Sequence, residues 1–192
     1  MAKQEDAMKW VVRAASNDET RPAMCGVKIE TLVPAHADVS ALRVAIACDG
    51  RQLRLAVVDT PLPDGLYHIK TLATIDAQYP NWRRIMPSYT KAFRVQVGNK
   101  NHGGLTDTHA LLLRLVTQFK MVVNPVFFAG MDGDWQLTIA DKEPNMHAIM
   151  LWSQFRVAVI MPIQPSVLEW APPQEKAAGW EPWTHVPAAR VA

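Results

Sequence analysis

The sequence lacks the patterns of most catalytic and metal-binding classes. It contains no His-Glu-x-x-His, no Gly-rich phosphate loop, no Gly-x-Ser-x-Gly and no zinc-ligand spacing. Its six histidines are scattered, mostly beside expected turns. Asp49, Asp64 and Asp132 each precede a glycine, so a turn accounts for them before catalysis does. We therefore predict a protein that is not an enzyme and that needs no cofactor or metal.

Cysteine, long apolar runs and excess charge are also scarce. Cys25 and Cys48 form no Cys-x-x-Cys pair, and we interpret them as reduced core residues of a cytoplasmic protein, with a disulfide as the alternative. No apolar run approaches the roughly 20 residues of a membrane span, and residues 1–6 do not resemble a signal peptide. The net charge of +2 does not by itself indicate nucleic-acid binding. We expect no membrane partner.

What is present is the pattern of one α+β domain. A chain of 192 residues can bury one good core. Apolar residues at helical spacing predict helices over 4–16 and 108–119, the second capped by Thr106 or Asp107. Apolar and alternating stretches predict strands over 23–32, 42–47, 52–58, 67–75, 91–98, 122–129 and 135–140. The extended stretch 146–161 is too long for one strand, so we predict a break near 152–154.

The stretch Val157 to Met161 is the strongest candidate for a central strand. It is β-branched and apolar, as expected of a strand buried on both faces, and Pro162 ends it because proline cannot donate to a sheet ladder. The plain interpretation is a final core strand. The apolar residues at its end also stand where the chain leaves the sheet, and methionine is common on surfaces that accept varied partners.

Three motifs in this chain resemble the bacterial sliding clamp, the β subunit of the replicative DNA polymerase. Val159-Ile160-Met161-Pro162-Ile163 resembles the Val-Val-Met-Pro-Met of the last clamp strand. Ala47-Cys48-Asp49-Gly50-Arg51-Gln52-Leu53 resembles the hairpin Ala-Thr-Asp-Gly-His-Arg-Leu. Tyr79-Pro80-Asn81-Trp82-Arg83-Arg84-Ile85-Met86-Pro87 resembles the connector Phe-Pro-Asp-Tyr-Arg-Arg-Val-Leu-Pro, and this match is the most specific of the three. A basic, aromatic loop that touches nucleic acid is the alternative for Arg83 and Arg84.

The resemblance implies a DNA-clamp-like α+β fold, with antiparallel β-sheets and two helices on one side. One clamp-like domain would span 1–165, with an inserted connector at about 76–90 and a tail over 166–192. The strand that precedes the first helix in clamps is missing from the sequence, so the chain looks like halves of two neighbouring clamp domains brought together.

The resemblance also implies a function by binding. In clamps an apolar groove receives short linear peptides of DNA polymerases and loader proteins. Carried over motif by motif, the groove would consist of Cys48, Gly50, Arg51, Gln52, Leu53, Pro80, Arg84, Ile85, Val159, Ile160, Met161, Pro162 and Ile163.

Clamps also encircle double-stranded DNA without reading its sequence, and the DNA-facing residues here would be Lys9, Arg13, Arg114 and Lys120. A ring of one-domain subunits would need a homo-oligomer of about six copies, by analogy with the six-domain ring of the family.

Two alternatives remain at this stage. The chain could be a structural or assembly protein of a mobile element with no peptide groove, or an enzyme with an unmarked site.

The tail after residue 165 is rich in Pro and Ala and carries Trp170, Trp180 and Trp183. We expect either a disordered or loosely docked tail, or a tail whose Leu168-Glu169-Trp170 rests in the groove of its own chain.

Overall fold

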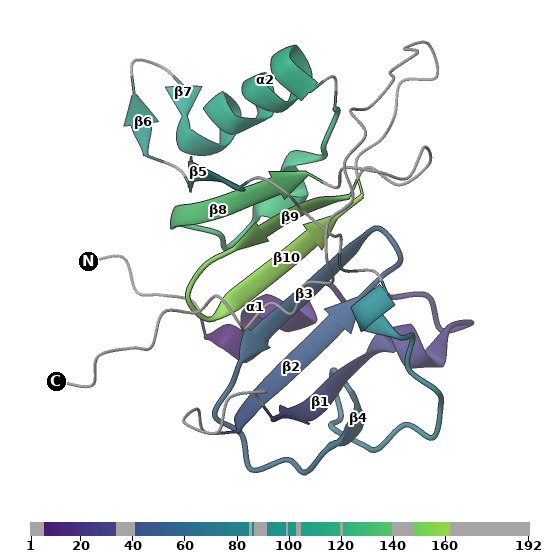
Figure 1. Ribbon diagram of the computed structural model, residues 1–192. Helices are drawn as coiled ribbons and strands as arrows, with labels where there is room; N and C mark the ends of the chain where they lie inside the picture. The colour runs from purple at the N-terminus through teal and green to yellow at the C-terminus, as the bar shows by residue number, and fades with distance from the viewer. Residues whose placement is uncertain are drawn as a thin grey trace, which may run out of the picture.

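An eight-stranded antiparallel sheet organises the chain (Figure 1), in the order β4-β1-β2-β3-β10-β9-β8-β5. The computed structural model describes residues 6–33, 41–84, 86, 92–98, 100–102, 105–119, 121–139 and 148–161. The strands are β1 (Gly26–Leu32), β2 (Leu42–Cys48), β3 (Gln52–Val57), β4 (Gly65–His68), β5 (Ala92–Val97), β8 (Gly133–Ile139), β9 (Ile149–Trp152) and β10 (Arg156–Ile160), with a small separate ribbon of β6 (Asn101–His102) and β7 (Leu105–Thr106). The helices are α1 (Ala7–Val12) and α2 (Asp107–Phe119), with 3-10 turns η1 (Pro22–Cys25), η2 (Trp82–Arg84) and η3 (Pro125–Phe128).

The sheet consists of two matching halves that meet at β3 and β10. In each half a helix is followed by three strands, β1 to β3 after α1 and β8 to β10 after α2. The halves join antiparallel, with Leu53 of β3 opposite Val159 of β10. In the second half β5 precedes α2 and pairs with β8, whereas in the first half β4, which follows β3, takes the equivalent place beside β1. Among the described residues, a later segment of the chain therefore holds the position beside β1 that β5 holds beside β8.

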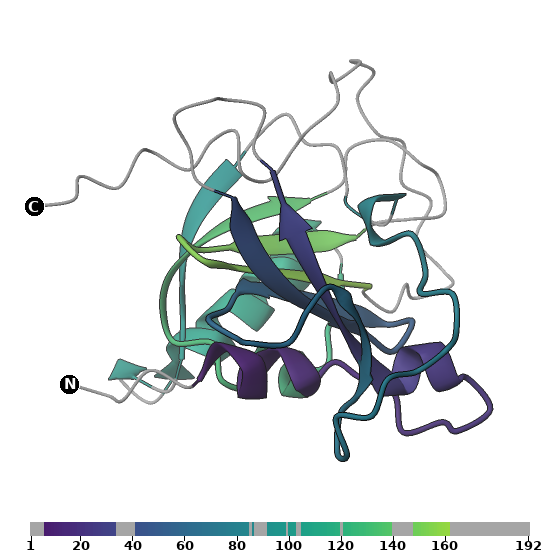
Figure 2. The ribbon, with the colours of Figure 1, turned by 90° about the horizontal axis from the view of Figure 1, so that it is seen from below.

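Both faces of the sheet are covered, which is why its central strands are apolar on both sides. The helix-side core packs α1 and α2 on one face through residues such as Trp10, Val11 and Leu115 (Figure 2). The outer core lies on the opposite face and includes Val44, Ile46, Leu55 and Val157, with Tyr79 and Trp82. All five residues of β10 are buried, so the prediction of a strand buried on both faces is confirmed.

Buried Arg54 fastens the helix-side elements to the middle of the sheet. Its guanidinium donates to the carbonyls of Trp10 at 3.1 Å, Ala129 at 3.1 Å and Phe127 at 3.0 Å. It also lies 5.0 Å from the ring of Trp10. One side chain therefore links β3 with α1 and with the η3 turn.

Most predicted elements are confirmed, with shifts at their ends. The first helix is shorter than predicted: the Asp6 carboxylate accepts from the Met8 amide at 2.8 Å, and the helix ends at Val12. The predicted cap of the second helix is confirmed for Thr106, whose hydroxyl accepts from the amide of His109 at 3.2 Å. The break within 146–161 is confirmed as the turn between β9 and β10.

Two strand predictions are wrong. The stretch 122–129 forms η3 rather than a strand, because Pro125 has no amide hydrogen for a sheet ladder and the Asn124 side chain accepts from the Val126 amide at 3.0 Å. The stretch 67–75 is not one strand either. β4 ends at His68 and the chain turns back, so that Thr74 forms an isolated bridge with Tyr67.

Candidate functional site

The predicted site begins at the turn between β2 and β3. The Asp49 carboxylate accepts from the Arg51 amide at 2.8 Å and from the Gln52 amide at 2.9 Å. Gly50 has a φ of 89°, a conformation that residues with a Cβ rarely adopt. The Asp-Gly pair thus fixes a tight turn that leaves Gly50 and Arg51 exposed at its tip.

The end of β10 lies directly beside this turn. Beyond the ladder pair Ile160–Gln52, the Met161 amide donates to the Arg51 carbonyl at 2.8 Å. Met161 itself is half-buried and packs against the outer core. The last described residue of the chain is therefore held against the tip of the hairpin.

The connector reaches the same region through Tyr79. Its hydroxyl donates to the Ile46 carbonyl and lies at the same 3.4 Å from the Cys48 sulfur, at the end of β2. Burial raises the pKa of the Tyr79 hydroxyl and that of the Cys48 thiol, so both stay protonated at neutral pH. This pair anchors the connector at the base of the hairpin, with half-buried Pro80 following it.

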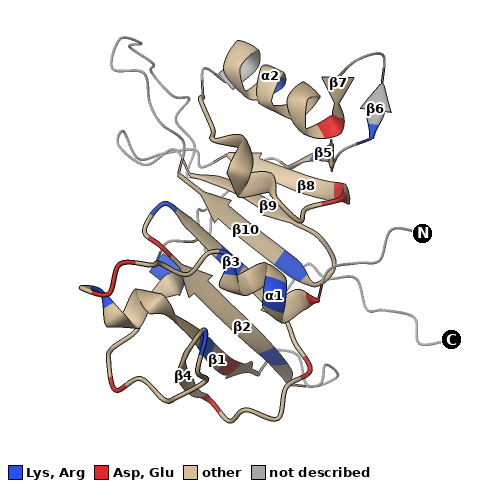
Figure 3. Ribbon diagram, turned by 180° about the vertical axis from the view of Figure 1, so that it is seen from behind, with Lys and Arg blue, Asp and Glu red and all other residues tan. Residues whose placement is uncertain are grey.

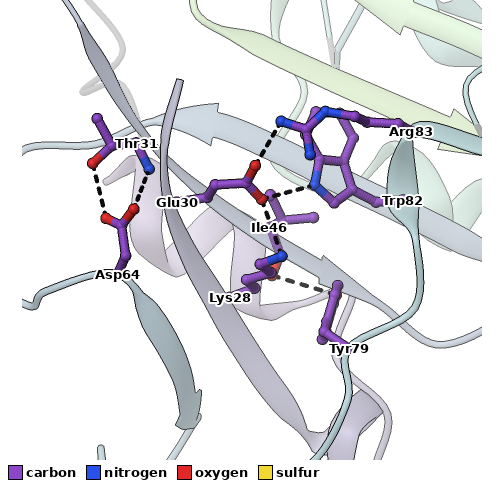
Figure 4. Close-up of polar contacts among 8 residues, drawn as sticks. All are labelled: Lys28, Glu30, Thr31, Ile46, Asp64, Tyr79, Trp82 and Arg83. Carbon is purple, nitrogen blue, oxygen red and sulfur yellow. Dashed lines mark hydrogen bonds and ion pairs between the residues drawn. The ribbon is translucent and has the colours of Figure 1, made fainter. Parts of the chain in front are cut away.

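Glu30 on β1 holds the next turn of the connector (Figure 4). Its carboxylate accepts from the Trp82 indole at 3.2 Å, from Arg83 at 2.5 Å and from Lys28 at 3.1 Å. Partial burial alone raises the pKa of Glu30, but the hydrogen bonds from Arg83, Trp82 and Lys28 outweigh it and the pKa lies below its ordinary value. The ionised carboxylate thus fixes η2 on the sheet, and Arg84 follows at its exposed end.

A fourth segment, between α1 and β1, joins the site and was not found from the sequence. A Cβ added to Gly50 would lie 3.8 Å from the Arg21 guanidinium and 3.8 Å from the terminal carbon of Met24. Arg21 is exposed and Met24 half-buried, so both side chains lie beside the hairpin tip. The stretch Asp18 to Pro22 gave no signal for this placement beyond its position before a strand.

The predicted groove residues separate into buried residues and an accessible set, the rim. Cys48, Leu53 and Val159 are at most 2% exposed and belong to the outer core. The accessible part is formed by Gly50, Arg51, Pro80, Arg84 and Met161, now joined by Arg21 and Met24.

Two predicted groove residues, Ile160 and Gln52, lie on the opposite face of the sheet, and three cannot be placed. Ile160 belongs to the helix-side core, so alternation along β10 turns its side chain away from that of Val159. The side-chain amide of Gln52, the ladder partner of Ile160, donates a hydrogen bond to the Asp49 carboxylate at 3.3 Å. Ile85, Pro162 and Ile163 lie outside the described residues.

The predicted DNA-facing residues differ between the two helices (Figure 3). Lys9 and Arg13 are exposed on and just after α1. Arg114 on α2 is half-buried, with its guanidinium 5.6 Å from the ring of Phe93. Lys120 lies outside the described residues. Basic side chains therefore point to solvent near α1, while α2 is largely uncharged.

Two other site classes find no support in the described part of the chain. No group of three or more His, Cys, Asp or Glu side chains there could hold a metal ion. None of the described helices has the length and apolarity needed to cross a membrane.

Comparison with known proteins gives a match in structure but not in sequence. No protein-family model and no curated protein matches the chain. Among solved structures, the β sliding clamp of Caulobacter crescentus is similar with a TM-score of 0.59 and 12% identity, over 83% of this chain and 62% of that one. The DNA polymerase III β subunit of Thermotoga maritima has a TM-score of 0.57 and 14% identity, over 83% and 63%.

A third similar structure is the β clamp of Helicobacter pylori bound to a DNA ligase peptide, with a TM-score of 0.55 and 11% identity, over 83% of this chain and 63% of that one. The chain thus has the fold of bacterial sliding clamps, as the sequence resemblance predicted. It spans less than two thirds of the length of the clamps it matches.

Proposed function

We propose that this chain, with its sliding-clamp fold, is a binding protein of DNA replication that receives short linear peptides of the polymerase or loader type at the rim described above. The observation that carries the proposal is the meeting of the hairpin 49–52, the connector and the end of β10 at one place on the outer face. These are the three segments whose motifs resemble the walls of the clamp groove. The peptide-bound clamp of Helicobacter pylori adds support by likeness.

The chemistry of the rim suits a peptide with apolar and polar residues side by side. Met24 and Met161 are half-buried and pack on the outer core, so they can adapt to apolar peptide side chains. Arg21 and Arg51 are exposed beside them, Arg84 is exposed at the end of η2, and all three can donate to a peptide glutamine, carboxylate or backbone carbonyl. The expected ligand is therefore an apolar motif, such as Leu-x-Leu-Phe, preceded by Gln or an acidic residue.

Affinity should be modest. Burying two apolar peptide side chains contributes about 3–6 kcal/mol. Loss of translational and conformational freedom offsets much of this, while hydrogen bonds to the arginines add to it. A dissociation constant in the micromolar range, about −8 kcal/mol, is the expectation.

We do not extend the proposal to encircling DNA. Among the described residues, Lys9 and Arg13 are the only exposed cations of the set expected to face DNA. Two cations per chain would give weak contact that salt abolishes. A processivity role would therefore depend on assembly.

The test is a fluorescence-polarisation titration of the full chain with a labelled Gln-Leu-x-Leu-Phe peptide. We expect saturable binding near micromolar in the wild type, and at least about tenfold weaker binding in Met161→Asp and in Met24→Asp. The matched control is Val126→Asp, a change at a residue that is 60% exposed on η3, away from the rim. It should bind as the wild type does.

Absence of binding by the wild type, with the chain shown to be folded, would overturn the proposal. It would favour the alternative of a structural or assembly protein without a peptide site. Equal loss in the Val126→Asp control would mean that the variants act through folding rather than through the rim.

A further inference from the structure

The two edge strands of the sheet, β4 and β5, differ in how their outer backbone groups are hydrogen-bonded, and this difference limits how copies of the chain can assemble. β4 pairs with β1 on one side, and its other side is bonded by its own chain. The His68 amide donates to the Ala73 carbonyl, the Ile75 amide donates to the Leu66 carbonyl, both at 2.8 Å, and Tyr67 bridges Thr74. A strand from another molecule therefore has no place beside β4.

The β5 edge carries no such cover among the described residues. β5 is the last strand of the sheet and pairs only with β8 in the described part of the chain. It is six residues long and contains no proline or bulge, two devices that often protect an edge. Such an edge is suited to pairing with another strand.

α2 lies at the same end of the molecule as β5 (Figure 1), and its charged residues are Asp107 and Arg114. Ala110, Leu113 and Val116 lie on the exposed side of α2, and Leu113 and Val116 are 56% and 44% exposed. The described cation of α2, Arg114, turns instead toward Phe93 on β5. An exposed apolar helix surface next to a sheet edge that has no partner among the described residues is typical of an interface.

We propose that two copies of this chain pair β5 against β5 around a two-fold axis, with the second copy as the occupant of this edge. A head-to-tail ring that continues the sheet would need two complementary edges in each chain, and β4 is already covered. A two-fold interface needs only one edge, used twice. The inference concerns assembly and holds whether or not the rim binds peptides.

The register follows from the side chains of β5. A two-fold axis perpendicular to the sheet makes the strands antiparallel and places residues of the same face opposite each other. An axis centred on Val95 pairs Phe93 with Val97 of the second copy, and this pair extends the helix-side core. The same axis pairs Arg94 with Gln96 of the second copy. Centring on Arg94 would place two like charges face to face.

Charge supports the same register. Gln96 stands opposite Asp134 of β8 and donates to its carboxylate. In the joined sheet, Gln96 would lie between Asp134 of its own chain and Arg94 of the second copy. The two-fold axis repeats this arrangement on the other side. On the helix side the axis brings the two copies of α2 next to each other.

The first test is sedimentation equilibrium of the full chain. We expect a mass twice the 21.4 kDa of one chain. The double variant Leu113→Glu with Val116→Glu should raise the dimer dissociation constant by at least about tenfold, because it adds four carboxylates to the two helices that the axis brings next to each other. The matched control is Leu72→Glu, a residue 53% exposed at the opposite end of the sheet, which should remain dimeric. A monomeric or six-fold wild type, or a dimer that the double variant leaves intact, would overturn the inference.

The second test is disulfide crosslinking, which reports the register. Directly opposed residues of an antiparallel pair lie at a Cα separation that a disulfide can bridge. Arg94→Cys and Gln96→Cys should each stay uncrosslinked alone under oxidation and give a covalent dimer when mixed. A dimer of Gln96→Cys alone would overturn the register, and absence of a crosslink in the mixture would overturn pairing through β5.

Discussion

Replacement of Glu30 by alanine should loosen the connector from the sheet. The carboxylate accepts from three donors, and the most buried of these is the Trp82 indole, on a side chain only 3% exposed. In Glu30→Ala this indole keeps its apolar contacts but loses its acceptor, and the Arg83 and Lys28 cations lose their counter-charge.

The magnitude follows from the burial of each donor. A buried hydrogen bond to a charged group contributes about 1.5–3 kcal/mol. The pairs with Arg83 and Lys28 are closer to the surface and add about 0–1 kcal/mol each. We expect Glu30→Ala to lower the free energy of unfolding by about 2–3 kcal/mol. Glu30→Gln should cost about half of that, because the amide oxygen can still accept from the indole.

The assay is urea unfolding followed by circular dichroism, together with a double-mutant cycle that adds Trp82→Phe. The cycle should give a coupling of at least about 1 kcal/mol between Glu30 and Trp82. The control is Glu19→Ala, an exposed acidic residue before β1, which should change stability by less than about 0.5 kcal/mol. A Glu30→Ala variant as stable as Glu19→Ala, or a coupling near zero, would refute the reasoning.

Three further predictions concern groups at or near the site. Because the pKa of Glu30 is lowered from its ordinary value of 4.5, the stability that its ionised form adds is complete above about pH 4.5 and is lost as the pH falls through the folded value; the gap between wild type and Glu30→Gln in acid titrations should close accordingly. Arg54→Met should cost at least about 3 kcal/mol in urea unfolding, because it leaves one buried and two partly buried carbonyls without their donor; a cost below 1 kcal/mol would contradict this. Cys48 should resist iodoacetamide at pH 8 in the native chain and react after unfolding, because burial raises its pKa; rapid native labelling would show that the hairpin base is open.

The local patterns of the sequence predicted most elements of the fold. β10 was expected because Val157 to Met161 is apolar without alternation, and its burial on both faces agrees. The error at 122–129 arose because apolar composition was weighed above Pro125, which removes a ladder donor. The pairing of β4 with β1 could not be predicted, since it joins segments far apart in the chain.

The site was predicted in part for a similar reason. The hairpin and the end of β10 carry motifs of fixed spacing, so their residues could be named in advance. Glu30 was missed because its contacts with Trp82 and Arg83 span more than 50 residues, and an isolated glutamate on a strand gives no signal. Ile160 was misplaced because the carried-over motif ignored the alternation of side chains along a strand.

The measurement that tests the central claim most directly is hydrogen exchange of the full chain with and without the Gln-Leu-x-Leu-Phe peptide. Our account predicts slower exchange in three separate segments on peptide binding: the hairpin around Asp49 to Gln52, the connector from Tyr79 to Arg84, and the end of β10 at Met161. Protection confined to another surface, such as α2 and β5, would contradict the claim that these three segments form the peptide site.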